Sequence, residues 1–91
     1  MVVSFLRQAL RNLEEIHAYY ATRPNPAHAH EVLTDIRAQI ERLAQYPAYG
    51  RSGKKVNTRE LIIRRYPYIA VYRVVGERVV IIRVHHARRH D

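Results

Sequence analysis

Apolar residues recur with a helical period through most of the first half of the chain. Between residues 6 and 20 they follow the i, i+3, i+4, i+7 spacing of one helix face, and a second stripe of this kind runs between residues 29 and 43. Pro24 ends the first pattern, and Asn25-Pro26 suits the start of the second, because asparagine caps free amides and proline fits the first helical position. Since the link is short, we predict two antiparallel helices that form a hairpin.

The period changes to two in the second half of the chain. Residues 46–57 contain proline and glycine and predict a loop. Three predicted strands follow, at residues 58–65, 68–75 and 78–85. Gly76 and Glu77 are expected to close the last two strands as a hairpin, with the glycine supplying a positive φ. With a weaker alternation at residues 2–5, the order is β-α-α-β-β-β, an α+β fold with a helical hairpin packed on one face of a small antiparallel sheet.

The pairing of the last two strands sorts their side chains into two faces. A two-residue loop pairs Val75 with Arg78, Arg73 with Val80, Tyr72 with Ile81 and Ala70 with Arg83. We predict that the face richer in branched aliphatic residues packs on the helices: Ile69, Val71, Arg73 near the rim, Val80, Ile82, Val84 and His86. The other face is predicted to be open to a partner and carries Tyr68, Ala70, Tyr72, Val74, Val79, Ile81, Arg83 and His85.

Length and composition indicate a single small domain spanning residues 1–91. The chain has no cysteine, no signal-peptide pattern and no apolar stretch long enough to span a bilayer, so we expect a cytoplasmic protein that does not associate with membranes. No nucleotide-binding fingerprint is present, and we expect no small-molecule substrate and no cofactor. No metal site is expected either, because the adjacent His85 and His86 point to opposite faces of a strand.

The positive charge is concentrated in the second half of the chain. Residues 46–91 hold eleven basic and three acidic residues, 11 − 3 = +8, which equals the formal charge of the whole chain, while residues 1–45 are balanced. Such asymmetry indicates an acidic partner, either nucleic acid or an acidic protein segment, although a solvated surface that aids solubility gives the same composition.

Four segments resemble, in order, the toxins of the RelE/ParE superfamily and of its ParE branch in particular. They are residues 9–20, residues 49–53 (YGRSG) with 58–61 (TREL), residues 66–74 (YPYIAVYRV) and residues 80–88 (VIIRVHHAR). Two positions depart from the family pattern. Asn12 replaces the usual aspartate, and Leu6 stands where serine or threonine normally caps the first helix.

The resemblance implies a non-enzymatic toxin of a type II toxin–antitoxin system, of the kind that stabilises plasmids. It implies that the toxin inhibits DNA gyrase and forms a hetero-oligomer with a ParD-like antitoxin, whose acidic C-terminal segment is initially disordered and folds on the toxin. One alternative is a RelE-like ribosome-dependent mRNA endoribonuclease, which needs cations and an acid–base pair; the cations are present, but no tyrosine follows Tyr72. Another is a non-enzymatic nucleic-acid-binding module, because the basic half of the chain can neutralise phosphates.

The residues expected to contact the antitoxin or the target are basic or aromatic, and none is expected to be catalytic. They are Arg51, Lys54, Lys55, Arg59, Tyr68, Tyr72, Arg73, Arg83, His85, His86 and Arg88. Arg83 is the most informative, because it interrupts an apolar strand and a buried, unpaired charge is costly. It must therefore face solvent, pair with an acid or bind a partner.

Overall fold

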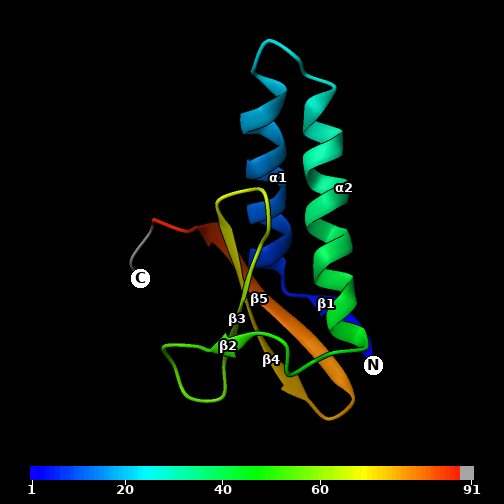
Figure 1. The fold of residues 1–91 in the computed structure, drawn as a ribbon, viewed down its shortest axis with the longest axis vertical. Coiled ribbons are helices and arrows are strands. Elements are labelled where there is room, and N and C mark those ends of the chain that lie inside the picture. Colours follow the sequence, from blue (N-terminus) through cyan, green and yellow to red (C-terminus); the bar gives the residue numbers. More distant parts are fainter. Residues whose placement is uncertain (89–91) are drawn as a thin grey trace.

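The computed structural model describes residues 1–88, whose elements follow the predicted order with one short strand added (Figure 1). The elements are β1 (Val2–Phe5), α1 (Arg7–Ala21), α2 (His28–Glu41), the 3-10 turn η1 (Arg42–Ala44), β2 (Arg51–Ser52), β3 (Arg59–Ile62), β4 (Tyr68–Val75) and β5 (Arg78–His86). The α+β prediction is confirmed, since two helices pack on a single five-stranded sheet.

The sheet is mixed, whereas the sequence predicted an antiparallel one. Its strand order is β1-β5-β4-β3-β2, and all pairs are antiparallel except β1 with β5. Parallel strands need a long crossover connection, and the chain between β1 and β5 includes the helical hairpin and the other strands. Alternation within residues 2–5 indicated a strand but carried no information on its neighbour or its direction.

The two helices run side by side, and the tip of their hairpin projects beyond the sheet (Figure 1). The second helix begins later than predicted, at His28, and its cap residue Ala27 makes no side-chain hydrogen bond. Asn25 contributes its backbone instead of its side chain, because its carbonyl oxygen accepts a 3.0 Å hydrogen bond from the His28 N–H. Neither helix is long and apolar enough to cross a bilayer within the described part of the chain.

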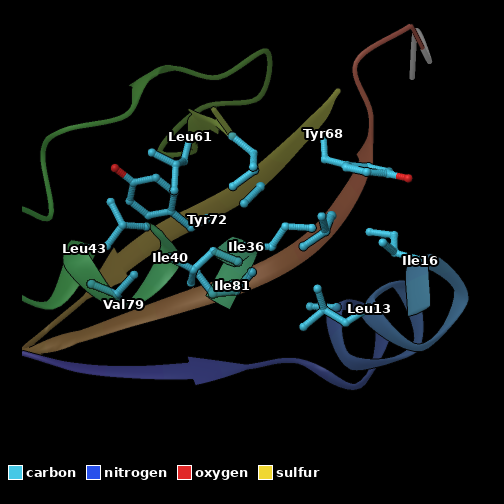
Figure 2. Close-up of a cluster of buried hydrophobic side chains, with 14 of the residues drawn as sticks. Leu13, Ile16, Ile36, Ile40, Leu43, Leu61, Tyr68, Tyr72, Val79 and Ile81 are labelled. Atoms are coloured by element: carbon cyan, nitrogen blue, oxygen red, sulfur yellow. The ribbon is translucent and has the colours of Figure 1, made fainter. Parts of the chain in front are cut away.

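The core lies between the hairpin and one face of the sheet (Figure 2). The helices, η1, β3 and the residue after it contribute Ala9, Leu13, Ile16, Val32, Ile36, Ile40, Leu43, Leu61 and Ile63. The two long strands contribute Tyr68, Ala70, Tyr72, Val79, Ile81 and Val84. Burial of each branched aliphatic side chain contributes about 1.5–3 kcal/mol before the loss of conformational entropy is subtracted.

The predicted sheet faces were reversed along β4 and only partly right along β5. Tyr72 pairs with Ile81 as predicted, but a register shift follows, so that Val71 pairs with Arg83 and Ile82 has no partner. The predicted pairing of Ala70 with Arg83 is therefore wrong, and Ala70 pairs with Val84.

This β-bulge explains why the two ends of β5 behave differently. Between Arg78 and Ile81 the residues that point into the core are Val79 and Ile81, which were predicted to lie on the open face. Beyond the bulge the prediction is correct, because Val84 packs inward and Arg83 lies on the other face. Along β4 the predicted inward position of Ile69 and Val71 and the predicted open position of Tyr68 and Tyr72 are both wrong. Both faces of this strand are largely apolar, so the pattern did not show which face meets the helices.

Candidate functional site

The sheet face away from the helices carries a lateral row of residues from four strands. Arg51 in β2 is opposite Glu60 in β3, which is opposite Val71 in β4, which is opposite Arg83 in β5. Opposite residues share a face, and Val71 alternates with the core residue Tyr72, so this row lies on the face that the helices leave open. We call it the open face.

The two arginines of this row differ in their partners. Arg51 donates from Nε to Glu60 Oε1 at 2.9 Å, and its Nη2 lies 2.9 Å from the same oxygen. The Glu60 side chain is only 10% exposed, so its burial is compensated by this ion pair. Arg51 is therefore largely neutralised, although its side chain stays 60% exposed and accessible to a partner.

Arg83 has no such compensation. It is half-buried at the end of the row, and its Nε is buried without a hydrogen-bond partner among the described residues. A buried donor that is left unpaired costs about 1–3 kcal/mol, and more when it belongs to a charged group. Its neighbour in the row is the apolar Val71, which is itself only 4% exposed, so the Arg83 cation lies beside a buried apolar side chain.

A basic loop borders one end of the open face. Lys54 and Lys55 are exposed in the turn between β2 and β3, and a groove beside them is also lined by Arg73 and Val74. The turn is closed by Thr58, whose hydroxyl donates to the Lys55 carbonyl at 2.6 Å. Lys54, Lys55 and Arg73 have no acidic partner among the described residues, so this groove is positively charged.

Arg59 was predicted to bind a partner, but its guanidinium holds the loop that precedes β2. Its Nη1 donates to the carbonyl oxygens of Gly50 at 2.8 Å and Ala48 at 3.2 Å. It lies opposite Tyr72 in β4, whose side chain is in the core. These contacts hold the loop in place, and Arg59 takes no part in the cross-strand ion pair, which joins Glu60 to Arg51.

The two candidate tyrosines are likewise inside the protein. Tyr68 is 8% exposed and Tyr72 is fully buried (Figure 2). Burial raises the pKa of both phenols; neighbouring tyrosines, Tyr20 first, add to the rise at Tyr68, whereas the Gly50 N–H and Arg59 partly oppose it at Tyr72. Neither hydroxyl is placed to contact a partner on the open face, which corrects the prediction.

The adjacent histidines at the end of β5 lie on opposite faces, as predicted. His85 pairs with Ile69 on the open face, and its Nδ1 is 2.9 Å from the His86 carbonyl oxygen. His86 points toward the helix side, where its ring packs edge-on against Tyr68 at 5.7 Å and its Nδ1 accepts from the Arg88 N–H at 3.1 Å. Arg88 is exposed after the strand. Over residues 1–88, no three histidine or carboxylate side chains gather as metal ligands.

Asn12 and Gln39 make long-range contacts that sequence reasoning did not identify. Asn12 Oδ1 accepts a 3.0 Å hydrogen bond from the Val84 N–H, which lies beyond the end of β1. Gln39 pairs with both backbone groups of Arg64. Each is a polar residue beside a buried helical stripe, and this was the only sequence signal for either contact.

The open face and its loop can bind an anionic chain by charge. Arg83, Arg73, Lys54 and Lys55 supply cations, and His85 shares the open face with Arg83. Tyr68 and Tyr72 are buried on the other side of the sheet. A cationic surface of this kind complements an acidic partner.

Known proteins match this chain over nearly its whole length. The sequence profile described as "ParE toxin of type II toxin-antitoxin system, parDE" matches residues 3–91. A curated protein of Sinorhizobium fredii, "Putative toxin Y4kP", is 42% identical over 82 residues, which cover 90% of this chain and 83% of that protein.

Solved structures of toxin–antitoxin systems share this fold. A chain of the chromosomal ParDE system from P. aeruginosa superposes with a TM-score of 0.90 at 28% identity, covering 97% of both chains. A chain of the E. coli RelBE toxin–antitoxin complex gives a TM-score of 0.63 at 15% identity, over 97% of this chain and 98% of that one, and this match concerns the fold alone.

Proposed function

Because the chain belongs to the ParE toxin family of type II toxin–antitoxin systems, we propose that it acts by inhibiting DNA gyrase and is neutralised by a ParD-like antitoxin. Residues 1–91 form one toxin domain that works in the cytoplasm without catalytic chemistry. The antitoxin supplies an acidic segment that orders on the toxin surface, so the two chains form a hetero-oligomer.

The unpaired Nε of Arg83 is the observation that carries the antitoxin part of this proposal. An arginine that is half-buried beside apolar neighbours gains most from a carboxylate, which accepts two parallel hydrogen bonds from one guanidinium. Arg73, Lys54 and Lys55 extend the positive field around it, and the one acid of the row, Glu60, is already paired with Arg51. An acidic protein segment matches this positively charged surface.

Two observations favour gyrase inhibition over mRNA cleavage. The chain is more similar in structure to the ParDE toxin–antitoxin system than to the RelBE complex, with TM-scores of 0.90 and 0.63. In addition, His86 lies on the helix side and engages Arg88 and Tyr68, so it is poorly placed to act with the loop lysines on one phosphate.

The test places the purified chain, freed of antitoxin, in two parallel reactions. One measures gyrase supercoiling of a relaxed plasmid, and the other measures translation of a defined mRNA on ribosomes. We expect supercoiling to be lost, or cleaved DNA complexes to accumulate, while the mRNA stays intact.

The opposite result identifies a different activity. Codon-positioned cuts in the mRNA with normal supercoiling would make this protein a ribosome-dependent nuclease. Steeply salt-dependent binding to duplex DNA, with neither reaction affected, would make it a nucleic-acid-binding module instead.

A further inference from the structure

Strand β3 has an outer edge that the fold covers only in part. Strand β2 pairs with β3 at Glu60 but does not extend beyond Arg51, so β3 continues without a neighbour on that side. The N–H of Ile63 donates to the Tyr68 carbonyl at 3.0 Å, which shows that residue 63 directs its backbone groups toward β4. Because backbone direction alternates along a strand, Ile62 directs its N–H and C=O away from β4, where no described residue bonds them.

The next outward position is closed by a side chain. Gln39 of α2 accepts from the Arg64 N–H at 2.7 Å and donates to the Arg64 carbonyl at 3.0 Å. The amide thus pairs with Arg64 as a neighbouring strand residue does. The free edge is therefore limited to Ile62, between the β2 pairing at Glu60 and the amide of Gln39.

A cavity of about 250 Å³ opens beside this free position. Leu43 and Leu61 line it and are both buried, so they form its apolar floor. Tyr46 and Tyr49 line it as well, but they are 58% and 71% exposed. Two exposed tyrosines beside an apolar floor are typical of a surface that buries a partner's side chain.

The rim of the cavity is mainly basic. Arg42, Arg64 and Arg65 line it, and the one acid, Asp35, is 3.5 Å from Arg65. With three cations and one carboxylate, the rim has a net positive charge, and it complements acidic residues on a chain that enters the cavity.

We propose that this edge, which we call the β3 edge groove (Ile62, Tyr46, Tyr49, Leu43 and Leu61), binds a short extended segment of the antitoxin. One residue of the segment pairs with Ile62 through two backbone hydrogen bonds, and its side chain lies on the open face beside that of Ile62. The residues on either side of it point to the helix side, where an apolar side chain fills the cavity. Flanking acids meet Arg42 and Arg64. The identity of the partner rests on the proposed function, whereas the groove itself rests on the geometry alone.

The groove is tested on the isolated full chain, without antitoxin or gyrase. The probe is the acetylated, amidated peptide Glu-Leu-Thr-Leu-Glu, titrated into the isotopically labelled protein and followed by NMR. We expect the Ile62 amide and the resonances of Tyr46, Tyr49 and Leu43 to shift together. A matched peptide with N-methylthreonine at the centre lacks the N–H donor, and we expect its affinity to be about tenfold lower.

Protein variants separate the contributions of charge and cavity. We expect Arg42→Glu to weaken the acidic peptide several-fold and to leave its Gln-Leu-Thr-Leu-Gln counterpart nearly unchanged. Tyr46→Ala with Tyr49→Ala is expected to weaken both peptides, and Tyr19→Ala, an exposed tyrosine on α1, serves as the control. The proposal is wrong if the N-methylated peptide binds as tightly as the unmodified one, or if the NMR shifts are centred on residues 52–58 in place of Ile62.

The same variants separate failure of the groove from failure of the proposed function. If the double tyrosine variant still binds the antitoxin with wild-type affinity, the antitoxin does not occupy the groove, whatever the gyrase assay shows. Conversely, loss of antitoxin binding in this variant supports the groove even if supercoiling is unaffected by the wild-type protein.

Discussion

The hydroxyl of Tyr72 accepts a 2.9 Å hydrogen bond from the backbone N–H of Gly50, which ties the centre of the sheet to the loop that precedes β2. The same hydroxyl donates to the Pro47 carbonyl at 2.7 Å. A core tyrosine thus satisfies two backbone groups of an irregular segment that has few partners of its own. This contact positions the chain on which Tyr49 and Arg51 meet the surface.

We expect Tyr72→Phe to lower the free energy of unfolding by about 2–3 kcal/mol. The substitution keeps the ring but leaves the Gly50 N–H and the Pro47 carbonyl without their partner, and an unsatisfied buried group costs about 1–3 kcal/mol. Urea denaturation followed by circular dichroism measures the change. Tyr46→Phe removes an exposed hydroxyl and should stay within about 0.5 kcal/mol of wild type. Equal stability of the two variants would show that the Tyr72 contacts contribute little.

Gly50→Ala tests the same junction from the other side. A Cβ at Gly50 would lie 2.7 Å from two atoms of the Tyr72 side chain and 2.9 Å from the Glu60 carbonyl, closer than real Cβ contacts allow. We expect a loss of about 1–3 kcal/mol in thermal or chemical denaturation, because the ring is fully buried and cannot move away. Ser52→Ala, at an exposed position in β2, is the matched control. A fully stable Gly50→Ala protein would mean that the loop shifts without cost.

Much of the fold could be predicted from periodicity, because helices and strands bury residues at different spacings. The limits are shown by one residue, Ile82, which the β-bulge leaves unpaired in β5. Both faces of β4 and β5 are rich in branched residues, so the pattern could not show where the register shifts or which face meets the helices. The tyrosines were assigned to the open face for that reason, although they belong to the core.

The sequence predicted the positive charge of the candidate site better than it predicted the contacts that its side chains make. The excess of cations after residue 46 indicated an acidic partner, and Arg83 lies on the predicted face. The sequence could not show that Arg59, unlike Arg83, makes its contacts within the protein. Its partners are backbone carbonyls of a loop whose course depends on Tyr72, and every residue has a backbone carbonyl, so residue types do not reveal such a contact.

Arg83→Met is expected to weaken antitoxin binding about tenfold or more while the protein stays folded. The substitution retains an unbranched apolar side chain next to Val71 but removes the guanidinium, whose charged hydrogen bonds contribute about 1.5–3 kcal/mol each. Affinity for the co-expressed antitoxin is measured by calorimetry, and folding by thermal denaturation. Arg78→Met, an exposed arginine at the other end of β5, controls for net charge. Wild-type affinity in a folded Arg83→Met protein would remove Arg83 from the interface.

Gln39→Glu separates the two hydrogen bonds that join α2 to Arg64. The carboxylate still accepts from the Arg64 N–H but cannot donate to the Arg64 carbonyl, so one bond is kept and the other is replaced by repulsion between oxygens. We expect a loss of about 1 kcal/mol relative to wild type, and a larger loss in Gln39→Leu, which makes neither bond. Gln45→Glu, an exposed glutamine outside the contact, is the control. Identical stability of the glutamate and leucine variants would contradict this separation of roles.

Titration of Tyr72 predicts how stability depends on alkaline pH. Burial raises the pKa of its phenol above its ordinary value of 10.0, so above that value the unfolded chain loses the proton while the folded protein keeps it. The folded state then binds more protons than the unfolded state, and the free energy of unfolding falls as pH rises, by up to about 1.4 kcal/mol per pH unit for one such group. The stabilisation is fully present below pH 10.0 and is lost as the pH rises through the folded pKa.

We therefore expect the free energy of unfolding of the wild-type protein to fall more steeply above pH 10.0 than that of Tyr72→Phe, which has no phenol at this position. Urea denaturation at a series of pH values compares the two slopes, with Tyr46→Phe as a control that should follow the wild type. Parallel slopes for wild type and Tyr72→Phe would show that the Tyr72 phenol titrates alike in both states and that its burial does not protect its proton.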